Sequence, residues 1–327
     1  MMDSLLEVKD LNTHFMIGKE IIKAVDGVTF SLARNETLAI VGESGSGKSV
    51  SVLSIMGLIK PPGKIVNGKI LYNSKNLLDL TERQMAKIRG DRISMVYQEP
   101  MTSLNPAISV GEQIREALII HKSYSKKKSK ERAINLMSDV RIPEADLRYK
   151  DLPGKFSGGM RQRIIIAMAI ACSPDILIAD EPTTALDVTI QAEIMELLRQ
   201  MKKKLKMSML LITHDLGIVA ENADRVIVMY CGIVMEEASV EELFRNPKHP
   251  YTIGLMECIP SIEMKAEKLN SIPGYVPHPS QYPDGCRFSN RCTKAMDICS
   301  RKMPNLIEIE VGHKVRCWLY GEERIYE

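Results

Sequence analysis

The sequence lacks any long apolar segment. None of its apolar runs approaches the roughly 18 to 20 uncharged residues that a membrane-spanning helix requires. Residues 1–10 also lack the basic stretch followed by an apolar stretch that marks a secretory leader. We therefore expect that the chain does not cross a membrane itself and that any role at a membrane depends on a partner protein.

The chain also has little excess charge. Its 44 Lys and Arg residues and 41 Asp and Glu residues leave a formal net charge of +3, which does not indicate a nucleic-acid partner. The one dense basic segment, residues 125–132 (SKKKSKER), is more typical of a solvated helix face. We expect no nucleic-acid partner.

The length of 327 residues exceeds what a single hydrophobic core usually organises, so a main domain with an appendage is expected. We predict a main domain over residues 1–245, with a helical subdomain at about 98–160, and an extension over 246–327. Prolines break the helical and strand periodicities of the extension, at positions 247, 250, 260, 273, 277, 279 and 283.

The hydrophobic pattern predicts an α/β fold. Residues 5–15 and 25–32 indicate two antiparallel strands, and the apolar run 37–41 indicates a buried parallel strand that enters a glycine-rich turn and then a helix over 48–58. Residues from about 81 to 152 indicate an inserted helical region. The α/β pattern then resumes, with helices expected at 164–171 and 189–204 and strands at 175–179, 209–213 and, as the last of the core, 225–230.

The turn after the third strand fits the pattern G-x-x-x-x-G-K-[ST] of a phosphate-binding loop. Glycines let the backbone N–H groups wrap phosphates at a helix N-terminus, while the lysine neutralises the β and γ phosphates and the final serine holds Mg²⁺. The predicted ATP-binding residues here are Gly42, Glu43, Ser44, Gly45, Ser46, Gly47, Lys48 and Ser49.

A pair of acidic residues follows another apolar strand. Asp180 and Glu181 come directly after residues 176–179, behind a phosphate loop in the same chain. We predict that Asp180 orders the water shell of Mg²⁺ and that Glu181 positions or deprotonates the attacking water.

Residues 156–163, FSGGMRQR, resemble the signature motif of ATP-binding cassette (ABC) ATPases, and they precede the acidic strand at that family's usual spacing. The hydroxyl of Ser157 and the exposed backbone N–H groups of Gly158 and Gly159 suit a γ-phosphate at a helix N-terminus. The resemblance implies a P-loop NTPase (RecA-like) nucleotide-binding domain with an antiparallel β-subdomain and an inserted helical subdomain. It also implies that this motif contacts ATP held by a second subunit.

The same resemblance implies roles for four further residues. Gln98 resembles the glutamine that touches Mg²⁺ and contacts the membrane subunit, and Asp187 belongs to a segment, ALD, that resembles the D-loop. His214 resembles the histidine that senses the γ-phosphate. Phe15 is the best-placed residue to stack on adenine, with His14 as the neighbour that could take its place.

Further strings resemble the ATPases of di- and oligopeptide and nickel importers: VGESGSGKS at 41–49, YQEPMTSLNP at 97–106, TTALD at 183–187, KHPYT at 248–252, and Met160 in the signature motif. The resemblance implies a peripheral protein on the cytoplasmic side of the cell membrane that powers peptide import. Its implied partners are a second, head-to-tail ATPase subunit, two membrane permease subunits and, indirectly, an extracellular peptide-binding protein. An importer of nickel or another small solute is the alternative, followed by a soluble ABC ATPase without a transport role.

Seven cysteines in a chain without an export signal indicate reduced thiols. Four of them lie in the extension with gaps of five, six and seventeen residues, wider than typical zinc knuckles: Cys286, Cys292, Cys299 and Cys317. This spacing and the resemblance favour a [4Fe–4S] cluster, with zinc or no metal as alternatives. The expected role is a staple for a region with little core, so that loss of the cluster would leave ATP binding largely intact.

Overall fold

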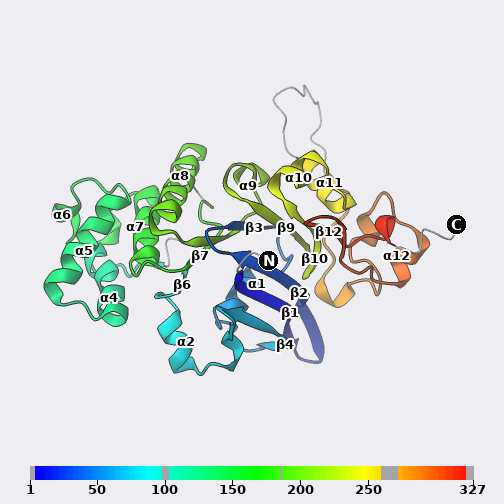
Figure 1. Ribbon diagram of the computed structural model, residues 1–327, viewed down its shortest axis with the longest axis horizontal. Helices are drawn as coiled ribbons and strands as arrows, with labels where there is room; N and C mark the ends of the chain where they lie inside the picture. Colours follow the sequence, from blue (N-terminus) through cyan, green and yellow to red (C-terminus); the bar gives the residue numbers. More distant parts are fainter. Residues whose placement is uncertain (1–3, 98–102, 185, 259–271, 322–327) are drawn as a thin grey trace. The chain divides into compact units, whose positions relative to one another are not determined.

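The computed structural model describes residues 4–97, 103–184, 186–258 and 272–321 (Figure 1). Within these ranges the chain divides into two compact units, which are described separately. The first unit comprises residues 33–37 and 79–212, and the second comprises residues 4–32, 38–78 and those from 213 onward. The extension thus belongs to the same unit as the phosphate loop, and the domain boundary at residue 245 stays a prediction.

The first unit contains three parallel strands in the order β8-β7-β6, with β6 at Ile93–Val96, β7 at Ile176–Asp180 and β8 at Ser208–Ile212. All their residues are buried, which explains why they are mainly apolar. The expectation of an all-helical segment over 81–152 is wrong at β6. A segment of only four residues, ISMV, is too short to be assigned to strand or helix from periodicity alone.

Six helices of the described chain belong to the first unit: α2 (Glu82–Ile88), α4 (Val110–Lys122), α5 (Lys126–Asp139), α6 (Ala145–Arg148), α7 (Gly158–Ile170) and α8 (Val188–Leu205). Helices α4, α5 and α7 pack on one another (Figure 1). The basic segment forms the start of α5, where Ser125 caps the helix by accepting a hydrogen bond from the N–H of Lys128.

The second unit contains a four-stranded sheet in the order β2-β1-β4-β5. Its strands are β1 (Ser4–Ile17), β2 (Glu20–Ala33), β4 (Gly63–Tyr72) and β5 (Lys75–Asn76). The two strands predicted at 5–15 and 25–32 are confirmed, whereas β4 and β5 were not predicted. Gly63 and Gly68 interrupt the strand pattern of β4, which forms by antiparallel pairing with β1.

The remaining strands of this unit are ordered β11-β12-β10-β9-β3, with β3 at Thr37–Val41, β9 at Arg225–Tyr230, β10 at Ile233–Ser239, β11 at Ile307–Glu310 and β12 at His313–Val315. Strands β3 and β9 are parallel, and the other pairings are antiparallel. The expectation that β9 is the last strand of the core is wrong, because β10 turns back on it and the extension adds two more strands.

Five helices complete the described part of this unit: α1 (Lys48–Ile55), α9 (Leu216–Asn222), α10 (Val240–Arg245), α11 (Pro250–Glu257) and α12 (Asp297–Arg301). The extension, which includes α11, shares a core with β9. The ring of Tyr230 in β9 lies 4.7 Å from that of Tyr251 and 5.4 Å from that of Phe288, and the rings of Tyr251 and Phe288 lie 5.3 Å apart. Cys286 and Cys299 belong to the same buried cluster. The extension therefore does not depend on its own small core alone.

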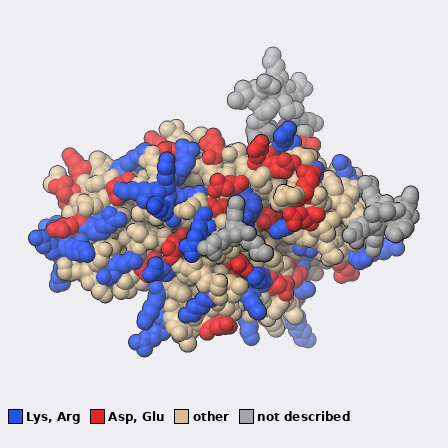
Figure 2. All heavy atoms as spheres, viewed as in Figure 1, with Lys and Arg blue, Asp and Glu red and all other residues tan. Residues whose placement is uncertain are grey.

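Among the described residues, no helix is long and apolar enough to cross a membrane. On the face shown in Figure 2, Lys and Arg side chains are interspersed with Asp and Glu side chains over both units. This mixture agrees with the small net charge of the sequence.

Candidate functional site: phosphate loop and acidic strand

The phosphate loop begins where β3 ends and leads into α1. Two of its glycines are sterically required: a Cβ atom at Gly42 would lie 2.1 Å from the carbonyl oxygen of Met229, and one at Gly47 would lie 2.5 Å from that of Ala24. Gly47 is also left-handed, with φ of 97°, where it caps α1. The predicted loop is therefore a constrained strand-to-helix turn whose N–H groups can face a phosphate.

Lys48 closes the loop on itself. Its ammonium group is buried and donates hydrogen bonds to the carbonyl oxygens of Gly42 at 2.7 Å and Glu43 at 3.0 Å, and to the hydroxyl of Ser46 at 3.3 Å. Ser44 and Gly45, at the crest of the loop, are exposed. Ser49 is half-buried in the first turn of α1. A phosphate group would replace loop acceptors around the lysine.

The acidic pair lies in the first unit. Asp180 is the buried last residue of β7, and Glu181 follows with φ of 47°, a left-handed conformation that is uncommon outside glycine. The N–H of Glu181 donates to the carbonyl of Ile212 at 2.9 Å, and the hydroxyl of Thr184 donates to its carboxylate at 2.8 Å. Strained residues that are held in this way cluster at functional sites.

The predicted signature motif forms the exposed N-terminus of α7. Ser157 is its N-cap, with a hydroxyl that accepts from the N–H of Met160 at 3.4 Å, and Gly158 is the first helical residue. A Cβ atom at Gly159 would lie 2.8 Å from Cγ2 of Ile190, so this glycine allows α7 to pack closely on α8. The motif thus combines exposed helix N–H groups with a packing constraint.

Of the other predicted site residues, Asp187 and His214 lie among the described residues and Gln98 does not. Asp187 is the N-cap of α8, with a carboxylate that accepts from the N–H of Ile190 at 3.0 Å, and His214 is exposed in the segment between β8 and α9. The phosphate loop and His214 belong to the second unit. The first unit contains the acidic pair, the signature motif and Asp187.

Phe15 and His14 lie near the end of β1. Phe15 pairs with Gly63 of β4, and its ring covers that glycine so closely that a Cβ atom there would lie 2.6 Å from it. His14 is half-buried, with an Nε2 atom that has no hydrogen-bond partner among the described residues. Burial lowers the pKa of His14. Both residues are half-buried, so the structure does not distinguish between Phe15 and His14 as the residue that stacks on adenine.

The four cysteines of the extension are neighbours. The N–H of Cys286 donates to the carbonyl of Cys299 at 2.8 Å. Burial raises the pKa of the Cys286 thiol to about 12, and the thiols of Cys299, Cys317 and Cys292 contribute in the same direction. Burial likewise raises the pKa of Cys317 to about 11, again with contributions from Cys292 and Cys299. Burial therefore favours the neutral thiol over the thiolate at these positions.

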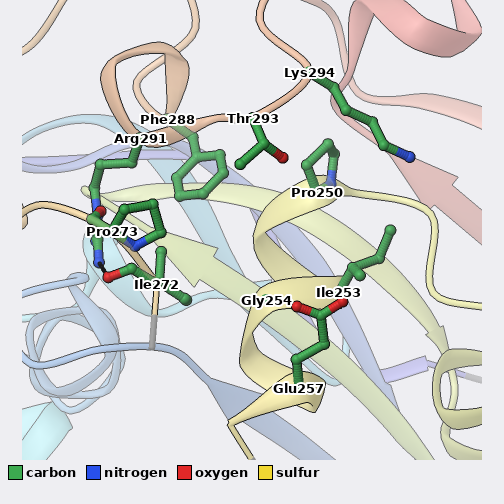
Figure 3. A pocket seen from close by; sticks show the side chains of 10 residues that line it. All are labelled: Pro250, Ile253, Gly254, Glu257, Ile272, Pro273, Phe288, Arg291, Thr293 and Lys294. Atoms are coloured by element: carbon green, nitrogen blue, oxygen red, sulfur yellow. Dashed lines mark hydrogen bonds between the residues drawn. The ribbon is translucent and has the colours of Figure 1, made fainter. Parts of the chain in front are cut away.

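Two residues that sequence reasoning missed contact the phosphate loop from far along the chain. The N–H of Glu43 donates to the hydroxyl of Tyr251 at 2.9 Å, and Arg291 forms a salt bridge to the Glu43 carboxylate. Nothing in the local pattern around either residue signals this contact. Arg291 also lines a pocket of about 210 Å³ whose ten lining residues all come from 250–294, so this pocket is not formed by the phosphate loop (Figure 3).

Comparison with known proteins defines the class. The family model "ABC transporter" matches residues 25–184, and "Oligopeptide/dipeptide transporter, C-terminal region" matches residues 235–299. The solved ADP- and Pi-bound dimer of the ATP-binding cassette MJ0796 is 29% identical, with a TM-score of 0.65 over 72% of this chain and 98% of that one. The cassette cbiO1 from Clostridium perfringens is 28% identical, with a TM-score of 0.65 over 75% of this chain and 92% of its own. The chain is an ATPase with the ABC cassette fold, as the sequence predicted.

The full-length relatives narrow the class further. The oligopeptide transport ATP-binding protein AppD of Bacillus subtilis is 54% identical over 98% of both chains. The oligopeptide transport ATP-binding protein OppD of Escherichia coli is 46% identical over 98% of this chain and 95% of its own. The chain therefore belongs to the family of oligopeptide and dipeptide transport ATP-binding proteins.

Proposed function

We propose that this chain is the ATP-hydrolysing subunit of a membrane importer of di- or oligopeptides. The observation that carries the proposal is the similarity along the whole chain to peptide transport ATP-binding proteins, including the C-terminal region that matches its own family model. The nickel alternative rests on the same resemblance, and the relatives reported above are named for peptides. Nothing in an ATPase touches the cargo, so transport has to be measured.

The proposed chemistry is positional. The loop N–H groups and Lys48 would bind the β and γ phosphates, and Glu181 would align the attacking water. Mg²⁺, which would be held by Ser49, Gln98 and Asp180, supplies positive charge that offsets the phosphate oxygens. The ring of Phe15 would stack on the adenine.

The proposed assembly pairs two such chains, or this chain and a related one, head to tail. Each composite ATP site would join Lys48 and Glu181 of one subunit to Ser157, Gly158 and Gly159 of the other. His214 would sense the γ-phosphate, and Asp187 would lie in the D-loop between the subunits. The pair would lie at the cytoplasmic side of the cell membrane beneath two permease subunits, which an extracellular peptide-binding protein supplies.

The extension would hold a [4Fe–4S] cluster through its four cysteines. The proposal rests on the sequence spacing of the four cysteines and on their proximity. Among the described residues no three of their sulfur atoms lie within 4.8 Å of one another, a distance that the trio Glu242, Glu310 and His313 does meet. Four thiolates on a tetrahedral zinc ion, with Zn–S bonds of about 2.3 Å, would lie about 3.8 Å apart. A cluster is larger and would cross-link the loops of the extension.

Two experiments test these proposals. Proteoliposomes with the two membrane subunits, the binding protein and this ATPase should take up a labelled dipeptide or oligopeptide with ATP, and uptake of nickel alone would instead favour the alternative. Anaerobic purification followed by iron, sulfide and zinc analysis should give about four iron and four sulfide per chain. One zinc or no metal would remove the cluster.

A further inference from the structure

Every polar group of Glu43, the second residue of the phosphate loop, has a partner. Its N–H donates to the Tyr251 hydroxyl, and its carbonyl accepts from the Lys48 ammonium at 3.0 Å. Its carboxylate accepts two hydrogen bonds from Arg291, of 2.7 Å from Nη1 to Oε2 and 3.1 Å from Nη2 to Oε1. The Glu43 carbonyl therefore accepts from Lys48 while the N–H and the carboxylate of the same residue are bonded by Tyr251 and Arg291, which lie outside the loop.

Arg291 is buried and fully bonded. Besides the two bonds to Glu43, its Nε donates to the carbonyl of Pro273 at 2.9 Å and its Nη1 to the Tyr230 hydroxyl at 3.3 Å. Although burial alone would lower it, the bonds to Glu43 and Tyr230 raise the pKa of Arg291 above its usual value. A planar fork with this many partners fixes the position of the carboxylate as well as neutralising it.

Arg291 belongs to the cysteine-bearing segment. It directly precedes Cys292, and Figure 3 shows it beside Ile272, Pro273 and Phe288 of the same part of the chain. Cys286 is likewise followed by Arg287, which bonds Asp26 and the carbonyl of Cys231. Two buried arginines therefore connect the loops that carry the cysteines to other parts of the same unit, including the phosphate loop.

We propose that Arg291 is a positioning residue for ATP binding, acting through the Glu43 carboxylate, and that the extension thereby sets the nucleotide affinity of the phosphate loop. This proposal rests on the proposed function of the loop. Two physical effects contribute. The Arg291 guanidinium fixes Glu43, and so keeps its carbonyl in place to accept from Lys48. It also neutralises the Glu43 carboxylate, whose negative charge would otherwise repel the phosphates of ATP.

The test compares variants of the full chain by their affinity for a fluorescent ATP analogue. We expect Arg291→Gln to weaken binding about tenfold or more, because it leaves the Glu43 carboxylate unpaired next to the phosphate loop. The matched control is Arg316→Gln. Arg316 directly precedes Cys317, as Arg291 precedes Cys292, but its bonds run to the carbonyls of Val234 and Pro304. The control should bind the analogue as the unaltered chain does.

A second variant separates the route through Glu43 from damage to the fold. Adding Glu43→Gln to Arg291→Gln should recover most of the lost affinity, since the unpaired charge is then removed. Thermal unfolding and iron content should change alike in Arg291→Gln and Arg316→Gln. Unchanged affinity in Arg291→Gln, an equal loss in the control, or a double variant as weak as Arg291→Gln would each overturn the proposal. Absence of binding by the unaltered chain would instead overturn the proposed function.

Discussion

The hydroxyl of Thr184 donates a hydrogen bond of 2.8 Å to the carboxylate of Glu181, whose backbone has the left-handed φ of 47°. This bond holds Oε2 of the carboxylate, so that one oxygen has a fixed hydrogen-bond donor at the end of β7. The arrangement suits a group that must align a water molecule and does not suit a flexible surface acid.

For this reason Glu181→Gln is expected to keep ATP binding while turnover falls by about 10² to 10⁴. The amide can occupy the same place but cannot accept a proton. Steady-state phosphate release and nucleotide binding, measured on the same preparation, check this. Gel filtration with ATP should also show a trapped closed dimer. Rapid turnover by the variant would contradict the role of Glu181.

Gly47→Ala should prevent nucleotide binding and destabilise the chain. The added Cβ atom would lie 2.5 Å from the carbonyl oxygen of Ala24, at a left-handed backbone position that costs alanine about 1 to 2 kcal/mol by itself. Denaturant unfolding and analogue binding measure the two effects. The comparison is Lys48→Ala, which should abolish binding without an equal loss of stability, and normal binding by Gly47→Ala would refute the described loop geometry.

We predict that the free energy of unfolding falls in acid because of His249. It is buried at the N-cap of α11, where its Nδ1 accepts from the N–H of Tyr251 at 2.9 Å, and burial lowers its pKa to about 3. Its neutral form stabilises the fold fully above the unfolded-state pKa of about 6.5. Below that pH the unfolded chain binds the extra proton, so stability falls by about 1.4 kcal/mol per pH unit until the folded pKa is reached.

His249→Asn isolates this effect because asparagine keeps an N-cap acceptor without a charge. Between pH 7 and pH 5, the unfolding free energy of the unaltered chain should fall by about 2 kcal/mol more than that of the variant. Urea unfolding at the two pH values measures the difference. Parallel pH dependence in the two chains would mean that His249 is not held neutral.

Replacing a cysteine of the extension should lower the affinity of the phosphate loop for nucleotide. Cys292→Ser is expected to reduce the iron content and also to weaken binding of the ATP analogue, because Arg291 is the adjacent residue. This expectation reverses the one drawn from the sequence, in which the extension is an independent staple. Cys172→Ser serves as the control, since that buried thiol lies in the first unit and bonds the carbonyl of Ala117. If Cys292→Ser loses iron but keeps its affinity for the analogue, the extension does not influence the phosphate loop, as the sequence led us to expect.

The sequence predicted the strands β3 and β9 with their observed bounds, because they are short, mainly apolar runs next to glycines. It also predicted the helix after the phosphate loop, from the motif that places a helix there. It did not predict β4, β6 or β10. β6 is short, β4 contains glycines and lysines, and β10 carries two glutamates, so each depends on its neighbours for pairing and burial. Local pattern was therefore sufficient for buried apolar strands and for the alternating strands β1 and β2, but not for strands whose residues are mixed or few.

The sequence by itself determined the chemistry of this protein. The phosphate loop, the acidic pair and the signature motif are each a short run of consecutive residues, whose function depends on local backbone geometry and side-chain type. Only the tertiary structure decided that Glu43 and Arg291, 248 positions apart, form a buried pair, and that Gly159 is required by Ile190. Such contacts arise from the packing of irregular loops, which have no periodicity from which a partner can be read.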